Sequence, residues 1–397
     1  MSEIPPNDWG KTALKNVANI RFSNVDKKTK PGERKVKLCN YIDVYNNEYI
    51  TRKIPFMEAT ASISEIEKFS ISEGDVLITK DSETPFDIGV PSVVSESLEN
   101  VICGYHLAQI KPKRDEIDPV FLAKQLGSDR IVRYFAQQAN GVTRYGLSTA
   151  AIENTSIWLP STLDEQRTIS QVLRNVDSII HNTETKIDKL GKIKAGLMQD
   201  LLTKGIDENG QIRDPEKHPE QFKDSPLGII PSEWDVLPCS EIMNLASGKS
   251  KTTKALALEK NCIFPVYGGN GITGFTSTPL STLPTIVIGR VGEYCGCVHI
   301  AYEPSWITDN ALYAKEISPE FDLEFLGHYL DWYNLKRLQS ATGQPLVTQT
   351  VIDEVLIRKP KMEEQTSIMT RVTSVVKQIE EENMLHSKLS FVKQGLM

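Results

Sequence analysis

The chain has 397 residues, of which 40% are hydrophobic and 24% are charged. This length suits two or three domains, and the composition excludes a collagen-like, globally disordered or rod-like chain. The formal net charge of −7 excludes a histone-like coat of cations, although DNA binding needs only a local basic surface.

The first globular segment is expected to run from about Trp9 to Pro160. It has a β-rich stretch at 75–80, a helical stretch at 121–139 and a turn at Gly141 before a short β-like run. The first domain is accordingly placed at residues 1–160.

A cationic stretch lies near the start of this segment. Between Arg21 and Lys37 there are seven cations and two anions, a local charge of +5 in an acidic chain. Pro31 and Gly32 predict a mobile loop there, and such a loop suits contacts with DNA phosphates. A solvated surface loop is the alternative.

Residues 40–49 supply amides, carboxylates and phenols, which can read base edges or stack on bases. A half-buried strand with its tyrosines on one face fits the same periodicity.

A long helix is predicted next, over residues 161–203. Its apolar positions step by four and three residues, which is the heptad pattern of a helix that packs on a partner. Acidic Asp164 and Glu165 suit its first turn because the helix dipole favours anions there. The stripe comprises Ile169, Leu173, Val176, Ile180, Thr183, Ile187, Leu190, Lys194, Leu197 and Leu201.

This helix is repeated at the end of the chain. Residues 164–198 align without a gap on 363–397, and eleven of the 35 pairs are identical. A repeat with a period near 200 is too long for a solenoid and indicates a duplicated half-protein. The second stripe was assigned to Ile368, Val372, Val375, Ile379, Leu385, Leu389, Val392 and Leu396.

The economical prediction is that the two helices pack on each other; the alternative is that each packs on its own domain. Polar Thr183, Glu382 and His386 interrupt the stripes. They either fix register or mark a bend or a solvent gap.

The second half repeats the order of the first. A linker or surface loop is predicted at 204–230, a second domain at 231–360 and the second long helix at 361–397. Within the second domain, a β-rich stretch at 285–290 and a helix at 323–340 match the first half. Gly268–Gly274 lets backbone approach a ligand closely, or is simply a turn between strands.

Catalytic motifs are missing from the sequence. It has no GxxxxGK[ST] loop, no strand-to-helix GxGxxG, no HExxH and no GxSxG. The amino-methyltransferase tetrapeptide Asn/Asp-Pro-Pro-Tyr/Phe is also missing. No catalytic site is therefore predicted.

Six sparse cysteines suggest a reducing, cytoplasmic environment. The close pair Cys295 and Cys297 is expected to be two strand cysteines, since zinc needs further ligands. No signal core or membrane span is evident, so we expect no metal site and no membrane association.

Together these features resemble the specificity subunits of type I restriction–modification systems, over essentially the whole chain. The order of the motifs carries the resemblance more than any one of them. They are Leu38–Tyr45, Leu159-Pro160 before Asp164-Glu165-Gln166, the helix end Leu197–Gly205, Pro231-Ser232-Glu233-Trp234 and Val266–Gly271.

The resemblance implies an α+β fold. Two target recognition domains, each with small mixed or antiparallel sheets and short helices, would be joined by two long antiparallel helices packed as a coiled-coil spacer. Each domain would read one half of a bipartite, asymmetric double-stranded DNA site.

The resemblance also implies a non-catalytic role. Two modification subunits would methylate adenine N6 from S-adenosylmethionine, and restriction subunits would add ATP- and Mg-dependent translocation and cleavage. This chain would hold no cofactor.

Other hypotheses stay open. One is a recognition chain that serves a fused cleaving and methylating partner at bipartite sites. Another is a coiled-coil assembly scaffold that does not bind DNA, and a third is a stand-alone enzyme.

Candidate residues follow from position and exposed chemistry. DNA contacts are assigned to Arg21, Lys27, Lys28, Lys30, Arg34, Asn40, Tyr41, Lys80, Arg144 and Tyr145 in the first domain, and to Lys249, Lys251, Lys254, Asn270, Arg290 and Gln344 in the second. Partner contacts on the outward helix faces are assigned to Arg167, Arg174, Lys186 and Lys192.

Overall fold

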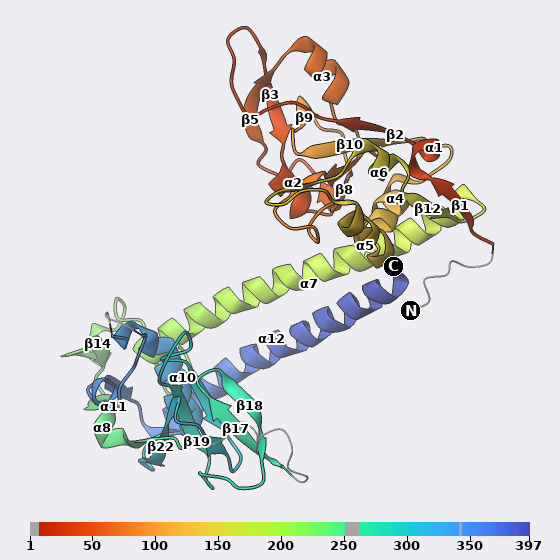
Figure 1. Cartoon of the computed structure of the whole chain (residues 1–397). Helices are drawn as coiled ribbons and strands as arrows, with labels where there is room; N and C mark the ends of the chain where they lie inside the picture. The colour runs from red at the N-terminus through yellow and green to blue at the C-terminus, as the bar shows by residue number, and fades with distance from the viewer. Residues whose placement is uncertain (1–7, 251–261, 341–343) are drawn as a thin grey trace. The chain divides into compact units, whose positions relative to one another are not determined.

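The computed structural model describes residues 8–250, 262–340 and 344–397. The chain forms two compact units (Figure 1). Unit 1 comprises Met1–Thr183 with Leu385–Met397, and unit 2 comprises Glu184–Met384. Each unit holds one globular domain together with segments of both long helices.

The domain of unit 1 is built from short strands and short helices. Its strands are β1 (Gly10–Ala13), β2 (Ala18–Phe22), β3 (Arg34–Cys39), β4 (Tyr49–Ile50), β5 (Met57–Ala61), β6 (Val76–Thr79), β7 (Asp81–Ser82), β8 (Pro91–Val94), β9 (Val101–Cys103), β10 (Leu107–Pro112), β11 (Tyr145–Gly146) and β12 (Ser156–Leu159). Its helices are α1 (Leu14–Val17), α2 (Tyr41–Tyr45), α3 (Ile63–Phe69), α4 (Pro119–Leu126), α5 (Asp129–Gln138) and α6 (Thr149–Glu153). The strands form a five-stranded sheet, β2-β10-β6-β8-β4, a three-stranded sheet, β5-β3-β9, and two small pairs.

Unit 2 repeats this plan. Its strands are β13 (Phe222–Ser225), β14 (Gly228–Pro231), β15 (Asp235–Pro238), β16 (Met243–Ser247), β17 (Phe264–Gly268), β18 (Gly271–Thr276), β19 (Thr285–Gly289), β20 (Val298–Ala301), β21 (Trp306–Ile307), β22 (Ala311–Ile317) and β23 (Leu356–Lys359). Its helical segments are η1 (Pro219–Gln221), α8 (Cys239–Ile242), α10 (Leu323–Tyr333), η2 (Leu335–Leu338) and α11 (Gln349–Asp353). The sheets β16-β22-β19-β20 and β18-β17-β21 match the two larger sheets of unit 1, which confirms the predicted α+β architecture.

The helix that opens the second half of each domain starts at an aspartate cap. The carboxylate of Asp118 accepts the amides of Val120 and Phe121 at the start of α4, and Asp322 accepts that of Phe325 in α10. Such caps satisfy amides that a helix start otherwise leaves unpaired.

Both helices are shorter than predicted. The helix expected at 121–139 is interrupted after Leu126, so α4 and α5 are separate. The helix expected at 323–340 ends at Asn334, which adopts a left-handed φ of 59° before the short η2.

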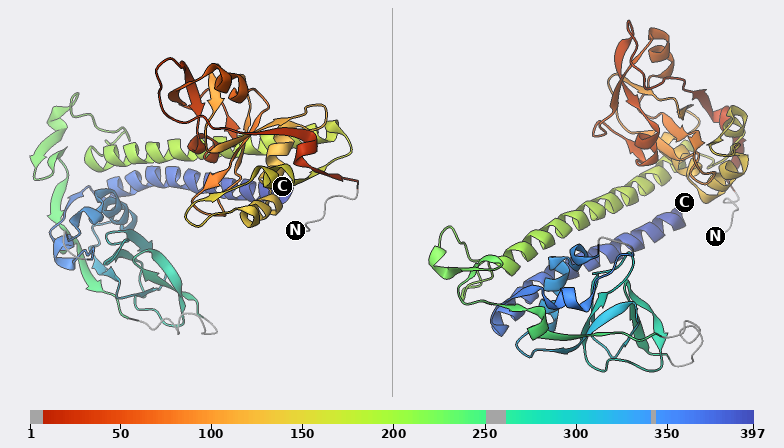
Figure 2. Two further views of the ribbon diagram at one scale, coloured as in Figure 1. Left: turned by 45° about the horizontal axis from the view of Figure 1, so that its top comes forward. Right: turned by 60° about the vertical axis from the view of Figure 1, so that its left-hand side comes forward.

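The two long helices are α7 (Leu163–Thr203) and α12 (Met362–Leu396), each unbroken in every view (Figures 1 and 2). All ten predicted stripe positions of α7 are buried or half-buried. Thr183, 5% exposed, donates its hydroxyl proton to the carbonyl of Ile179 at 2.9 Å. The predicted heptad stripe of α7 is therefore confirmed.

The predicted stripe of α12 is wrong in its second half. Leu385, Val392 and Leu396 are 42%, 47% and 49% exposed. Leu389 is half-buried as predicted, and the other half-buried positions in this part of α12 are Glu382, His386, Ser390 and Lys393. The polar residues taken as interruptions are thus part of the inward face, because the stripe continues in steps of three and four regardless of side-chain polarity.

Contacts between α7 and α12 occur in each unit. In unit 1 the Asp177 carboxylate pairs with the Lys393 ammonium at 2.8 Å, and in unit 2 the Lys186 ammonium pairs with the Glu382 carboxylate at 2.5 Å. Later positions in α7 therefore pair with earlier positions in α12, as in antiparallel helices.

The first turn of each long helix is fastened to its own domain by a glutamine. Gln365 is fully buried, accepts the Asp322 amide at 2.8 Å and donates to the carbonyls of Glu320 and Pro360 at 3.0 and 2.9 Å. Gln166 likewise accepts the Asp118 amide at 2.9 Å and donates to a carbonyl of the same loop. This shared task explains why the glutamine is identical in both copies.

The preceding glutamate binds the tryptophan that opens each domain. The indole N–H of Trp234 donates to Glu364 at 2.8 Å, and that of Trp9 donates to Glu165 at 3.3 Å. In unit 2 the carboxylate also accepts the Arg213 guanidinium at 2.6 Å and the Ile206 amide at 2.8 Å.

Residues 204–230 are more ordered than the linker we expected. They contain η1, β13 and most of β14, which pairs with β13 as a hairpin. Ile206 and Ile230, near its two ends, are 4% and 1% exposed and belong to the core of unit 2.

Gln365→Leu should lower the free energy of unfolding of unit 2 by about 2–4 kcal/mol, because it leaves buried backbone groups unpaired. Hydrogen exchange of the α10 and α12 amides under mild denaturant would measure this loss. Thr366→Ala, at an exposed neighbouring position, is the control and should change stability by under about 0.5 kcal/mol. Equal effects of the two substitutions would contradict the assigned role of Gln365.

Candidate nucleic-acid interface

Four loops of the first domain meet around Lys80. The Lys80 amide donates to the His106 carbonyl at 3.0 Å, and the Lys80 carbonyl accepts the Leu147 amide at 2.9 Å. Nearby, the Gly104 amide donates to the Cys39 carbonyl at 2.8 Å. Backbone bonds therefore bring together the ends of β3 and β6, the start of β10 and the segment around β11.

Cationic and aromatic side chains gather on this backbone frame. The Lys80 ammonium lies 5.0 Å from the centre of the Phe22 ring and 4.9 Å from that of Tyr105. His106 pairs with Asp81 at 2.8 Å, and the Arg144 guanidinium approaches the other ring nitrogen at 3.4 Å. Stacked rings and donors of this kind suit contacts with bases and phosphates.

Tyr41 extends the same surface through α2. Its ring stacks on that of Tyr45, with centroids 5.5 Å apart and an interplanar angle of 15°. Burial raises the pKa of Tyr41, and a hydrogen bond with Ser82 partly opposes it, so the phenol stays protonated at neutral pH. The alternative of one tyrosine-lined strand over residues 40–49 is wrong, because Tyr41 and Tyr45 lie in α2 and Tyr49 lies in the short strand β4.

The second domain contains the same frame around Arg290. Its amide donates to the Asn310 carbonyl at 2.9 Å, and its carbonyl accepts the Val347 amide at 2.9 Å. The Thr308 amide donates to the Tyr267 carbonyl at 2.9 Å. In the same order, these bonds match the Lys80–His106, Leu147–Lys80 and Gly104–Cys39 bonds of the first domain.

The side chains on the second frame are different. Arg290 replaces Lys80 and reaches the Ser247 hydroxyl at 3.5 Å, while exposed Asn310 replaces His106. Gly289 leaves no room for a side chain, since a Cβ there would lie 2.1 Å from the carbonyl oxygen of Tyr294. Tyr294, 42% exposed, is consequently held close to the frame.

Several predicted residues lie on or beside the frames. In the first domain these are Tyr41, Lys80, Arg144 and the half-buried Tyr145, which pairs with Ser82 through β11 and β7. In the second they are Arg290, Asn270 in the exposed turn between β17 and β18, and exposed Gln344 next to the segment that pairs with Val291.

Asn40 has a structural role. It is 8% exposed and precedes α2, where its backbone N–H donates to the Asp43 carboxylate at 2.7 Å. Its side chain therefore does not face solvent as a reader of base edges would.

The cationic stretch is not one loop. Arg21 lies in β2 and donates to the carbonyl of Lys68 at 3.0 Å, and Arg34 opens β3. Lys27 and Lys28 are exposed between these strands. Lys30 lies between Asp26 and Glu33, at 3.9 and 3.8 Å.

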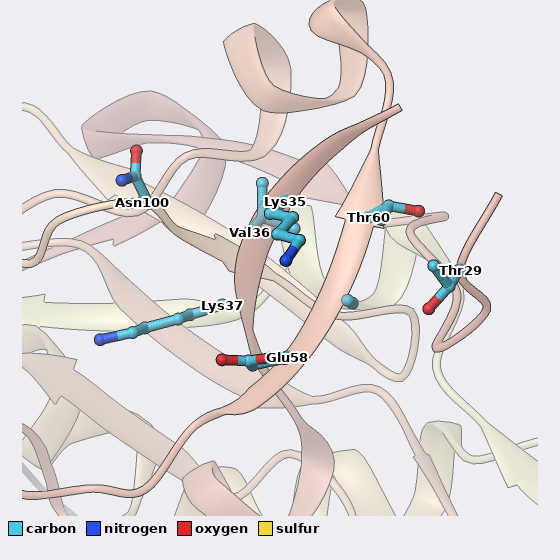
Figure 3. Close-up of a pocket in the computed structure, with 8 residues that line it drawn as sticks. Thr29, Lys35, Val36, Lys37, Glu58, Thr60 and Asn100 are labelled. Carbon is cyan, nitrogen blue, oxygen red and sulfur yellow. The ribbon is translucent and has the colours of Figure 1, made fainter. Parts of the chain in front are cut away.

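A hollow of about 290 Å³ lies on the β5-β3-β9 sheet (Figure 3). Lys35 and Lys37 project from β3 beside it, with Glu58 on the neighbouring strand. The carboxylate of Glu58 offsets part of the positive charge, so the hollow is a mixed surface. It is lined by Thr29, Lys35, Val36, Lys37, Glu58, Ala59, Thr60 and Asn100.

The predicted lysine cluster of the second domain is described only at Lys249. This residue is exposed, and its carbonyl accepts the indole N–H of Trp306 at 3.1 Å. Lys251 and Lys254 lie outside the described residues.

Three of the four predicted partner-binding residues contact their own chain. Lys186 pairs with Glu382 on α12, and the Arg174 guanidinium lies 5.8 Å from the centre of the Tyr49 ring. Arg167 is exposed and pairs with Asp164 at 3.1 Å, and Lys192 is exposed.

The cysteines are not paired with one another. Burial raises the pKa of the Cys39 and Cys103 thiols, and that of Cys239 to about 12. Cys295 lies in a turn and Cys297 just before β20, so neither is the strand cysteine we predicted. Among the described residues no His, Cys, Asp and Glu cluster could hold a metal, and no described helix is long and apolar enough to cross a membrane.

Sequence reasoning missed Tyr105, His106 and Asp81 in the first domain, and Tyr294 and Asn310 in the second. His106 and Asn310 share one signal, because each immediately precedes an apolar strand, β10 or β22. Aligning those strands between the two halves would have brought both residues into view.

The family model of the type I restriction modification DNA specificity domain matches residues 6–192 and 231–389. The chain therefore belongs to this family of specificity subunits, whose role in a type I system is non-catalytic.

Related chains agree with this assignment. A putative type I restriction enzyme specificity subunit, MjaX, of Methanocaldococcus jannaschii is 22% identical over 99% of this chain and 92% of its own. The MjaVIII specificity subunit of the same organism is 23% identical over 82% of this chain and 78% of its own.

The fold is also similar to that of a solved structure. The type I restriction–modification S subunit from M. genitalium aligns with a TM-score of 0.67 at 17% identity, covering 100% of this chain and 96% of that one.

Within the cationic stretch, Lys27→Ala should weaken DNA binding more than Lys30→Ala. The ammonium of Lys30 is already partly neutralised by Asp26 and Glu33. A cation that neutralises one DNA phosphate steepens the dependence of log affinity on log salt concentration by close to one. Affinity measured in the assembled complex between about 50 and 200 mM salt would show the difference. If Lys30→Ala reduced the salt dependence of DNA affinity more than Lys27→Ala, this ranking would be contradicted.

Proposed function

We propose that this chain reads a bipartite, asymmetric double-stranded DNA site, one half with each domain, and directs partner subunits to methylate adenine N6 within it. The observation that carries the proposal is one backbone frame built twice with different side chains. Lys80, His106 and Arg144 stand in one domain where Arg290, Asn310 and Gln344 stand in the other.

Different side chains on equal frames favour different half-sites. Arg bonds guanine through two acceptors and Asn bonds adenine through an acceptor and a donor, so Arg290 and Asn310 carry a direct base-reading chemistry. In the first domain, Lys80, His106 and Arg144 offer another set of donors beside aromatic rings. Neighbouring backbone bonds hold each set in a fixed geometry.

Partners supply the remaining activities. We propose two modification subunits that bind S-adenosylmethionine, and restriction subunits that use ATP and Mg, with this chain holding none of these cofactors. The proposed location is the cytoplasm, where the DNA and these partners are found.

Sequencing for N6-methyladenine tests the proposal. Co-expression of this chain with its cognate modification subunit, in a host without such methylation, should yield a two-part motif with a fixed gap. The two halves should differ, because the side chains on the two frames differ. A continuous motif would refute the bipartite model, and no new methylation would favour an assembly scaffold.

Arg290→Ala and Lys80→Ala should each relax one half of the motif. Loss of a base contact lowers discrimination by about 1–3 kcal/mol at the position it reads, so methylated sites should become degenerate in the second half for Arg290→Ala and in the first for Lys80→Ala. Methylation profiles of both variants would show this. The control Lys217→Ala, at an exposed position that belongs to neither frame, should leave both halves intact.

The half-by-half assignment fails if Arg290→Ala and Lys80→Ala degrade the same half. It also fails if either variant lowers total methylation while the motif stays fully specific.

A further inference from the structure

Asp177, in the middle of α7, is the centre of a polar network inside unit 1. Its side chain is 8% exposed. It accepts a hydrogen bond from the Tyr49 phenol at 2.6 Å and forms ion pairs with the Lys124 ammonium at 2.5 Å and the Lys393 ammonium at 2.8 Å. One carboxylate thus joins three elements besides its own, namely β4, α4 and α12.

Glu48 closes this network from its exposed side. Its carboxylate contacts Lys124 at 2.6 Å and also contacts Lys393. Both lysines are largely buried, with side chains 10% and 20% exposed. Each therefore lies between two carboxylates, and the network holds two positive and two negative charges.

Asp177 and Lys393 stay charged at neutral pH despite their burial. Burial by itself would raise the pKa of Asp177, but hydrogen bonds from Lys124, Lys393 and Tyr49 outweigh it and keep that pKa below its usual value. Burial would likewise lower the pKa of Lys393, and its bonds to Asp177 and Glu48 raise it instead. Tyr49, whose pKa is raised by burial and by Asp177, remains a proton donor.

The duplicated half provides a natural comparison. Lys194 is the counterpart of Lys393 in the repeat, and Val376 is the counterpart of Asp177. His328 follows the capping Asp322 by six residues, as Lys124 follows Asp118. In unit 2 the pKa of His328 is lowered, mainly by burial and to a smaller extent by the positive charge of Lys194.

The two units therefore share the position of the lysine on the long helix, but only unit 1 has the acid. Val376 packs against the apolar core of unit 2 instead. The carboxylate at 177 is present in one copy of the repeat and not in the other, so packing common to both copies does not account for it.

We propose that Asp177 is a positioning residue that fastens the last turns of α12 to the first recognition domain and so fixes how that domain is held on its helices. The domain contributes Tyr49 and Lys124, α7 contributes Asp177, and α12 contributes Lys393. None of these elements can shift against the others without separating buried opposite charges, which is strongly unfavourable.

Hydrogen exchange of the full chain tests the fastening without DNA. Lys393→Met and Asp177→Asn should each speed exchange of the α12 amides in residues 385–393 by about tenfold, since a lost buried charge pair lowers the free energy of local opening. Lys393→Arg, which keeps the charge, should restore slow exchange. The matched control Lys194→Met, in the repeat without the acid, should leave residues 385–393 unchanged.

The functional consequence rests on the proposed function and is tested separately. In the methylation assay, wild-type protein should discriminate strongly against a site whose gap is one base pair longer. Lys393→Met and Asp177→Asn should reduce this discrimination by about tenfold while both half-site sequences stay the same. A purely structural role would lower methylation of all sites equally, and Lys194→Met should leave the discrimination intact.

The outcomes separate the two proposals. Unchanged exchange in Lys393→Met and Asp177→Asn would overturn the fastening. Faster exchange with unaltered gap discrimination would overturn the positioning role. If wild-type protein yields no two-part site, the proposed function fails, whereas the exchange data still decide whether Asp177 fastens α12.

Discussion

The fold depends on one buried glutamine in each half of the chain. Gln166 and Gln365 satisfy backbone groups in the loop before α4 and α10, and the aspartate at the end of that loop caps the helix that follows. The adjoining glutamate takes the indole of the tryptophan that opens the domain. A domain and its long helix are therefore joined by hydrogen bonds whose directions fix their mutual orientation, which apolar contact alone does not do.

The two domains share their backbone arrangement but differ in the side chains proposed to contact DNA. The backbone bonds of Lys80 and Arg290 are the same within 0.1 Å, yet the half-buried and exposed side chains on the two frames differ. The proposed reading of two unlike half-sites needs this combination. Rigid strands place the readers, and exposed positions between the strands are free to diverge because packing does not constrain them.

Several cations of the chain are paired with its own carboxylates. The chain is acidic overall, and several cations near the first domain are partly neutralised, as Lys30 is by Asp26 and Glu33. Lys124 and Lys393 are used inside unit 1 rather than at its surface. The cations available to DNA are thus fewer than the composition suggests.

The sequence by itself determined the duplicated order, the two long helices and the inward face of α7. These depend on local chain geometry, since apolar residues three and four apart must share a helix face. It also indicated Lys80, Arg290 and the glycine-rich turn at Asn270. It misassigned the last turns of α12, because polar Glu382, His386 and Lys393 occupy the inward face while Leu385 and Val392 are exposed.

Only the tertiary structure decided which residues meet. His106 lies beside Arg144 and Asp81, and Asp177 lies between lysines from α4 and α12, although these residues are far apart in the chain. It also showed that Asn40 is a buried cap and that α4 and α5 are separate helices. The physical reason is that hydrogen bonds and ion pairs act over a few ångströms between residues brought together by long-range packing, and periodicity along one segment contains no record of its partner.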